Sequence, residues 1–230
     1  MGETSFVIEC LSIVAQSLST LAIPLINQIV DHKTYGHIIM GLSNFINEDW
    51  ENAAKQFNQV NVKDDHLRWQ VKYIMALALI KACNDTLPDE FKVLYGNKAM
   101  HFLSDISSNL DIPSTLIPEI ILRIGSIKKV VWFAHKQWHN LQLAQDNESD
   151  EIIDILNNGL SLAIMQNKID LIEEYYYQLG CTYAIAGNRI KAQLYYKTLG
   201  VGTYKGEKLR ERIKKRYNTT MFLEGELEDS

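Results

Sequence analysis

Proline and glycine are scarce in this chain, whose 230 residues include 4 prolines and 12 glycines. A fold made of many short strands needs frequent turn residues, and long disordered linkers are usually rich in both. The low content of both therefore argues against an all-β fold and against extended linkers. Because 47% of the residues are hydrophobic and 22% are charged, the composition is that of a globular protein, and helix is the expected structure.

Cysteine is also rare. The three cysteines, Cys10, Cys83 and Cys181, are far apart, odd in number and without the paired spacing of metal ligands. This distribution predicts neither a disulfide framework nor a zinc site, and we interpret all three as reduced core residues. The N-terminus has no basic stretch before its apolar run and no obvious cleavage motif, so we expect no secretory signal and a cytoplasmic location.

An excess of positive charge is absent as well, since the net charge is −5 and the isoelectric point is near 5.7. Proteins bind nucleic acid largely by neutralising phosphates with Lys and Arg, so nucleic acid is not an expected partner. Glycine-rich phosphate loops are missing. His135 and His139 lie one helical turn apart, but Lys136 stands where the zinc-peptidase motif has a glutamate, and no third ligand is evident. The sequence therefore predicts no metal, no cofactor and no enzymatic activity.

Residues 10–30 carry no charge, yet their pattern is amphipathic. In a helical projection the polar face holds Glu9, Ser12, Gln16, Thr20 and Asn27, opposite Val7, Leu11, Val14, Leu18, Leu25 and Ile29. A helix surrounded by lipid would not keep a polar stripe, so we expect no integral membrane span. Residues 1–33 are expected to cap the helices that follow, with self-association or membrane-surface contact through residues 6–30 as the alternative.

The strongest positive signal is a spacing of small and aromatic residues near the C-terminus. It consists of Tyr176, Leu179, Gly180, Tyr183, Ala192 and Tyr196. This spacing describes two helices that lie against each other, with a small residue where they touch. The same offsets recur at Gly41, Ala53 and Phe57. The two glycines, at positions 41 and 180, are 139 residues apart, which is close to four periods of about 34 residues.

Residues 171–200 resemble the tetratricopeptide repeat (TPR) at each of these positions, and residues 37–60 share its skeleton. The resemblance implies an all-α fold, a right-handed α-α superhelix of antiparallel helix pairs. It implies about five units within residues 34–204. A generic helical hairpin with small residues at its close contacts is the alternative reading.

Helix signals place the first units along the chain. The first unit spans about residues 35–60, with Asp49 as the N-cap of its second helix. A long apolar helix is expected over residues 67–82. Residues 84–96, which contain Pro88, are interpreted as an insertion, so that the partner helix resumes at Asn97.

The later elements follow from similar signals. One long helix is expected over residues 118–144, and Ser149-Asp150-Glu151 is expected to cap the next. The turn at Asn167-Lys168 leads into the unit that matches the repeat best. Residues 205–217 are predicted to form a basic capping helix and residues 218–230 an acidic, disordered tail.

In TPR proteins the first helix of each unit lines a concave groove, and the resemblance gives this role to positions in the first and last units. These positions are Ile38, Leu42, Phe45, Glu174, Tyr177, Cys181 and Ala184. We therefore expect an adaptor or scaffold that binds a peptide or helix of another protein. The alternative is an assembly or anchoring subunit that uses its N-terminal helix for oligomerisation or docking to a membrane surface.

Tyrosine is concentrated at the same end, because eight of the eleven lie between Tyr175 and Tyr217. Three of the eight belong to the repeat spacing. Tyr175, Tyr177 and Tyr195 do not, and they form a candidate contact surface, since rings with a polar tip are favoured in interfaces. Packing between neighbouring helix layers is the equal alternative.

Overall fold

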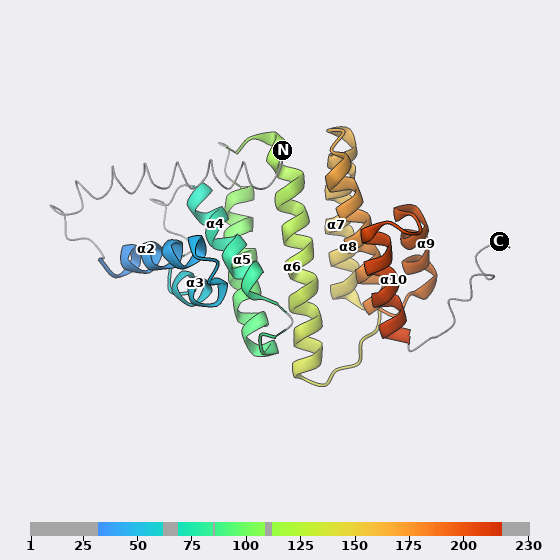
Figure 1. The fold of residues 1–230 in the computed structure, drawn as a ribbon, viewed down its shortest axis with the longest axis horizontal. Coiled ribbons are helices and arrows are strands. Elements are labelled where there is room, and N and C mark those ends of the chain that lie inside the picture. The colour runs from blue at the N-terminus through green and yellow to red at the C-terminus, as the bar shows by residue number, and fades with distance from the viewer. Residues whose placement is uncertain (1–31, 62–68, 85, 109–111, 218–230) are drawn as a thin grey trace. The chain divides into compact units, whose positions relative to one another are not determined.

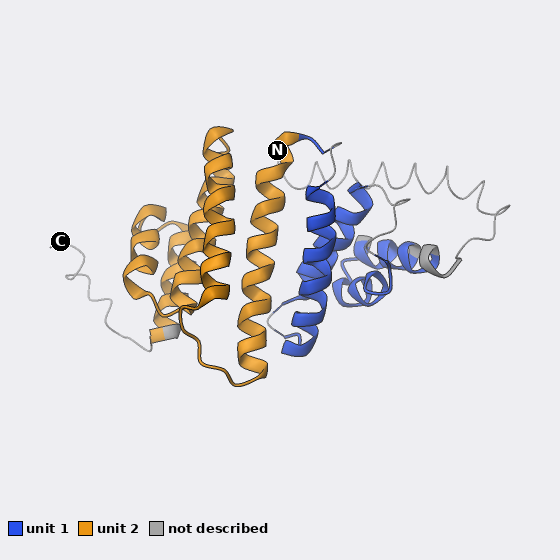
Figure 2. Ribbon diagram, turned by 180° about the vertical axis from the view of Figure 1, so that it is seen from behind, with its two compact units in different colours: residues 1–113 blue, residues 114–230 orange. Residues whose placement is uncertain are grey.

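The computed structural model describes residues 32–61, 69–84, 86–108 and 112–217, and every regular element in these ranges is a helix (Figure 1). The predicted all-α class is thus confirmed for this part of the chain. The chain divides into two compact units, residues 1–113 and 114–230 (Figure 2). The N-terminal helix predicted over residues 1–33 lies almost entirely outside the described residues, and the tail predicted over residues 218–230 lies outside them completely.

The described residues of the first unit form two pairs of helices. α2 (His32–Ile46) packs on α3 (Trp50–Phe57), and α4 (Trp69–Ala82) packs on both α3 and α5 (Asp89–Ser107). Asp49 is the N-cap of α3, where its carboxylate accepts a hydrogen bond from the Asn52 N–H at 3.2 Å. The predicted N-cap of the first unit is confirmed.

Gly41 of α2 meets the ring of Phe57 of α3. A Cβ atom at Gly41 would lie 2.3 Å from Phe57 Cε1, so the absence of a side chain makes room for the ring. Ala53 and Phe57 are fully buried. The close packing predicted from the glycine–alanine–aromatic spacing is present in this pair.

α4 and α5 form the second pair, and the start of α5 corrects the sequence analysis. Residues 71–79 of α4 are buried without interruption. α5 begins at Asp89 rather than Asn97, so residues 89–96 belong to the helix and not to an insertion. Pro88 takes the N-cap position, where a missing N–H costs nothing, and its carbonyl accepts hydrogen bonds from the N–H groups of Phe91 and Lys92 at 3.0 and 3.1 Å.

The second unit contains five α-helices within residues 112–217. A short 3-10 turn, η1 (Ser114–Leu116), leads into α6 (Ile117–Trp138), which packs on α7 (Asn147–Met165) and contacts α8 (Ile169–Ile185). α8 packs on α7 and on α9 (Arg189–Leu199). α10 (Tyr204–Tyr217) packs on both α8 and α9, and corresponds to the predicted basic helix.

Four helices end in the same way, with one residue in the left-handed region. These residues are Glu48, Asn140, Asn167 and Gly187, with φ of 59°, 52°, 53° and 88°. In each case the next N–H bonds to the carbonyl oxygen five residues earlier, at 2.8 to 3.0 Å. This Schellman arrangement satisfies the last carbonyl groups of the helix and turns the chain within a few residues.

The end of α6 and the start of α7 give two further corrections. α6, predicted to continue to Ala144, ends at Trp138 because Asn140 reverses the chain. The N-cap of α7 is Asp146 rather than Ser149. Ser149 lies in the first turn of α7, and its hydroxyl accepts a hydrogen bond from the Asp146 N–H while its own N–H donates to the Asp146 carboxylate, each at 2.9 Å.

Taken over the ranges that the structure describes, no helix combines the length and the apolar character needed to cross a bilayer.

Candidate protein-binding surface

The positions predicted to line a groove differ in how far a ligand can reach them. Ile38, Leu42 and Phe45 are buried inside the first unit, where the Phe45 ring meets Trp50 edge-on at 5.1 Å between centroids. In the second unit Cys181 and Ala184 are buried, whereas Glu174 and Tyr177 are half-buried. Of the seven side chains, only those of Glu174 and Tyr177 offer surface in this structure.

α10 covers the part of α8 that was expected to face a ligand. The Tyr217 hydroxyl donates a hydrogen bond to the Ala184 carbonyl at 3.4 Å, and the buried Leu209 side chain lies against Gly180. The C-terminal half of α8 is therefore used for packing. The open part of this face is its N-terminal half, around Glu174 and Tyr177.

A chain of polar contacts crosses this open part and links three helices. Lys129 Nζ of α6 donates a hydrogen bond to Gln178 Oε1 of α8. Gln178 Nε2 then donates to Glu174 Oε1, one turn earlier on α8, at 2.7 Å. Glu174 forms an ion pair at 3.4 Å with Lys205 of α10. The contacts fix the orientation of side chains that would otherwise be free to move.

Tyr177 and Arg212 complete the surface. The Arg212 guanidinium of α10 lies 5.9 Å from the centroid of the Tyr177 ring, within the range of a cation–π interaction. Burial, helped by the Cys181 thiol, raises the pKa of Tyr177 although the positive charge of Arg212 opposes the shift. The phenol therefore stays neutral and can both donate and accept a hydrogen bond. We call this surface the inner strip and define it by Lys129, Glu174, Tyr177, Gln178, Lys205 and Arg212.

Lys129 is unusual because it is a charged side chain with only 6% of its surface exposed. Burial lowers the pKa of Lys129, as expected for an ammonium group removed from water. Within the described part of the chain, no carboxylate forms an ion pair with it. Lys72 of the first unit is just as buried, but it pairs with Asp105 at 2.7 Å. Lys129 thus places a buried amino group behind Gln178, without a carboxylate partner in the described ranges such as Lys72 has.

The three tyrosines singled out from the sequence have separate roles. Tyr175 is fully buried, and its hydroxyl donates a hydrogen bond to the Pro118 carbonyl, so it belongs to the core and not to a contact surface. Tyr195 packs between two tyrosines of α8, with ring centroids 6.0 Å from Tyr176 and 5.8 Å from Tyr183. Tyr177 alone of the three lies on the inner strip.

Four residues of the strip were missed by the sequence analysis, namely Lys129, Gln178, Lys205 and Arg212. Gln178 carries a weak signal, because it stands one turn after Glu174 and one turn before Cys181 and so shares their face. Lys129 and Arg212 come from other helices, 49 residues before and 34 residues after position 178. Only tertiary contacts bring them together.

The two histidines weighed as metal ligands lie at the end of α6, where His135 is in the last turn and His139 is the C-cap residue. The rings of His135 and His139 lie 4.6 Å apart between centroids. Across the residues with described positions, no group of three or more His, Cys, Asp or Glu side chains is arranged to hold a metal ion.

Comparisons of the chain with protein families, with curated proteins and with solved structures find no match. The resemblance to the tetratricopeptide repeat therefore rests on the residue spacing itself.

Proposed function

We propose that this chain is an adaptor or scaffold of the TPR-like type, in which successive helix pairs form a superhelix and a segment of a partner protein binds along the inner strip. The proposal includes the cytoplasmic location expected from the sequence. Binding would use shape and polar complementarity, without catalysis. The surface is formed by α6, α8 and α10. α6 and α8 are the first helices of the pairs α6–α7 and α8–α9, and α10 follows the second pair.

The observation that carries the proposal is the pairing of Tyr177 with Arg212. Tyrosine and arginine are enriched among residues that dominate binding energy, because each combines a flat, partly apolar body with polar groups at its end. Here the ring is half-buried, which limits the entropy lost when a partner covers it. The hydrogen bonds among Lys129, Gln178 and Glu174 hold the neighbouring side chains in place.

The charges of the strip indicate which partner groups it favours. Lys205 and Arg212 are cationic at the surface, while Lys129 lies buried behind Gln178. Glu174 is the acidic residue of the strip, and the neighbouring Glu173 also pairs with Lys205, at 3.8 Å. Backbone carbonyl oxygens or carboxylates of a bound segment would therefore meet donors, while Glu174 and Gln178 offer acceptors for its N–H groups.

Binding variants test the proposal directly. Tyr177→Ala and Arg212→Ala should each weaken capture of the partner by about thirtyfold or more, since residues of this kind contribute roughly 2 kcal/mol or more at interface centres. The matched control is the Tyr204–Lys208 pair of α10, where the ammonium lies 4.4 Å from the centroid of the exposed ring. Tyr204→Ala and Lys208→Ala should leave capture unchanged. Equal losses in both pairs would contradict the assignment of the inner strip.

The anchoring alternative concerns residues outside the described ranges, and a deletion separates it from the adaptor. A chain that lacks residues 1–30 should keep its partner if the inner strip binds it. If the deleted chain stays folded but loses its partner, its oligomeric state or its membrane association, the anchoring function is correct and the adaptor proposal is wrong.

A further inference from the structure

A second surface of the same unit lies on the outer side of α9. Ala192 and Tyr196 bury the inner side of this helix against its neighbours. The opposite side carries Ile190, Leu194 and Lys197, which are spaced i, i+4 and i+7 and so share one face. Ile190 is 81% exposed and Leu194 is 59% exposed. We call these three residues the α9 face.

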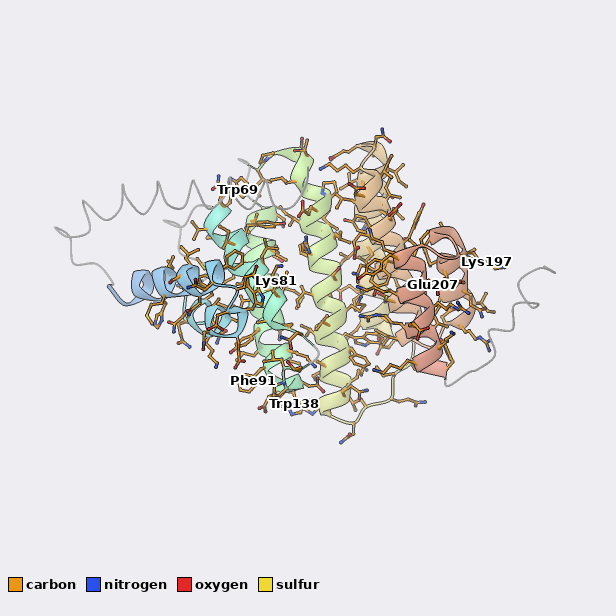
Figure 3. All side chains as sticks on the ribbon, in the orientation of Figure 1. Trp69, Lys81, Phe91, Trp138, Lys197 and Glu207 are labelled. Atoms are coloured by element: carbon orange, nitrogen blue, oxygen red, sulfur yellow. The ribbon has the colours of Figure 1, made fainter. Side chains whose placement is uncertain are left out.

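The charged residues of α9 itself have one sign. α9 contains Arg189, Lys191 and Lys197, and neither Asp nor Glu occurs in it. Lys191 lies over the Tyr183 ring at 4.9 Å from its centroid, so its charge is held at the edge of the helix. Lys197 projects outward near the end of α9 (Figure 3). The face therefore combines an exposed aliphatic pair with positive charge on either side.

The N-terminal end of the face opens into a shallow hollow of about 400 Å³. It is lined by Gln145, Ala186, Gly187, Asn188, Arg189 and Ile190. Asn188 caps α9 through its hydrogen bond from the Lys191 N–H at 3.2 Å, and its amide also reaches Gln145 Oε1 at 3.4 Å. The hollow is thus a shallow, open feature beside the α8–α9 turn.

We propose that the α9 face and its hollow bind an acidic, amphipathic segment of a partner protein. Apolar side chains of that segment would cover Ile190 and Leu194, one of them entering the hollow, and its Asp or Glu side chains would lie near Lys191 and Lys197. Charge complementarity selects this partner, because a segment with basic flanks would place like charges together. The inference concerns a different surface from the inner strip and does not depend on it.

A membrane surface is the less suitable occupant. Helices that insert at a bilayer surface present a broad apolar side, usually with Trp, Phe and several Leu, and many Lys or Arg residues. The α9 face offers two aliphatic side chains and no aromatic ring, which is little area to bury in lipid. The polar Asn188 and Gln145 at the hollow suit a specific protein contact better.

Fluorescence anisotropy on the full chain tests this inference. The labelled probe is a synthetic helical peptide with leucines on one face and glutamates on the other. The peptide should bind saturably, and binding should weaken as salt is raised. The double variant Ile190→Glu/Leu194→Glu should reduce its affinity at least tenfold. A peptide in which lysines replace the glutamates should not bind.

The matched control uses a second exposed apolar pair, at the end of α7. Ile164 and Met165 are 52% and 81% exposed, close to the values of Leu194 and Ile190. Ile164→Glu/Met165→Glu should leave peptide affinity unchanged. Circular dichroism should show the same helix content in every variant, since all of the changed residues are exposed or half-buried.

Four results would overturn the proposal. The first is that the folded wild-type chain does not bind the peptide saturably, and the second is that both glutamate double variants lose the same affinity. The third is that the chain binds phosphatidylserine vesicles and not the peptide, and the fourth is that it binds the peptide only after residues 218–230 are removed. The third result would assign the face to a membrane. The fourth would assign it to the acidic C-terminal segment of the chain itself.

Discussion

The Leu209 side chain of α10 lies against the bare backbone of Gly180 in α8. A Cβ atom at position 180 would be 2.4 Å from Leu209 Cδ2 and 3.1 Å from Tyr195 Cβ of α9. One glycine therefore sets how closely three helices of the second unit approach. The same residue occupies the small position of the spacing that suggested a helical repeat.

Substituting Gly180 should open this three-helix contact. Gly180→Leu is expected to lower the free energy of unfolding by about 1–3 kcal/mol, the usual cost of overpacking a core. Urea unfolding followed by circular dichroism measures the change. An unchanged unfolding midpoint would mean that α9 and α10 do not approach α8 as described.

Two glycines of α2 provide a matched pair for the same argument. A Cβ atom at Gly41 would lie 2.3 Å from the Phe57 ring, whereas a Cβ atom at Gly36 would meet nothing within 4 Å. Gly41→Ala should destabilise the protein, while Gly36→Ala should stabilise it by about 0.5–1 kcal/mol, because alanine restricts the unfolded chain and favours helix. Thermal unfolding of the two variants should shift in opposite directions, and a shift of both in one direction would contradict the packing of α2 on α3.

The glycine contacts show what the sequence could predict. Gly, Ala and aromatic residues at fixed offsets identified the pairs α2–α3 and α8–α9, because close helix packing needs small residues at regular positions. Asp49 was recognised as an N-cap because the chemistry of a cap is local. Neither prediction required knowledge of distant residues.

Two of the errors have local causes, and a third has a distant one. Asn140 adopts a left-handed conformation that non-glycine residues rarely take, so the apolar pattern beyond Trp138 was extended as helix to Ala144. Pro88 was interpreted as part of an insertion, although proline is favoured at a helix start. The burial of Cys181 and Ala184 depends on α10, which no spacing within α8 reveals.

Lys129 and Lys72 are equally buried, but only Lys72 has a carboxylate partner in the described ranges. Replacing each by methionine should therefore change the stability in different directions. Lys129→Met should leave stability unchanged or raise it, because it removes a buried charge with which no carboxylate of the described ranges forms an ion pair. Lys72→Met should lower the free energy of unfolding by roughly 1–3 kcal/mol, since Asp105 loses its partner. Chemical denaturation at neutral pH distinguishes the two.

The lowered pKa of Lys129 predicts how the stability difference between wild type and Lys129→Met changes with pH. Because the folded-state pKa lies below the unfolded value of 10.5, the folded protein releases this proton first as pH rises. Wild-type stability should then increase relative to Lys129→Met between the two pKa values. A difference that stays constant from neutral pH to pH 10.5 would show that Lys129 is not held in a desolvated site.

Asp146 joins the start of α7 to α6 and should make that junction sensitive to acid. Burial raises the pKa of Asp146, but hydrogen bonds from Lys136, the Ser149 N–H and Trp132 outweigh it, so the net shift is downward. A carboxylate with a lowered pKa stabilises the fold above its unfolded value of 3.8, and this contribution is lost as pH falls through the lower folded value.

Asp146→Ala should cost about 1 kcal/mol at neutral pH through loss of the N-cap. The deficit relative to wild type should shrink below about pH 4, which unfolding curves measured across the acid range would detect. A deficit that is independent of pH would contradict the ionised cap.

Site-specific photocrosslinking tests the adaptor function most directly. The photoreactive residue benzoylphenylalanine replaces Tyr177 in one variant and Met165 in a second variant. Both variants are irradiated in extracts of the cells that make the protein. The account predicts a crosslink to a second polypeptide from position 177 and none from position 165, which is exposed but lies outside both proposed surfaces. The same crosslink from both positions, or none from position 177 in a folded chain, would contradict it.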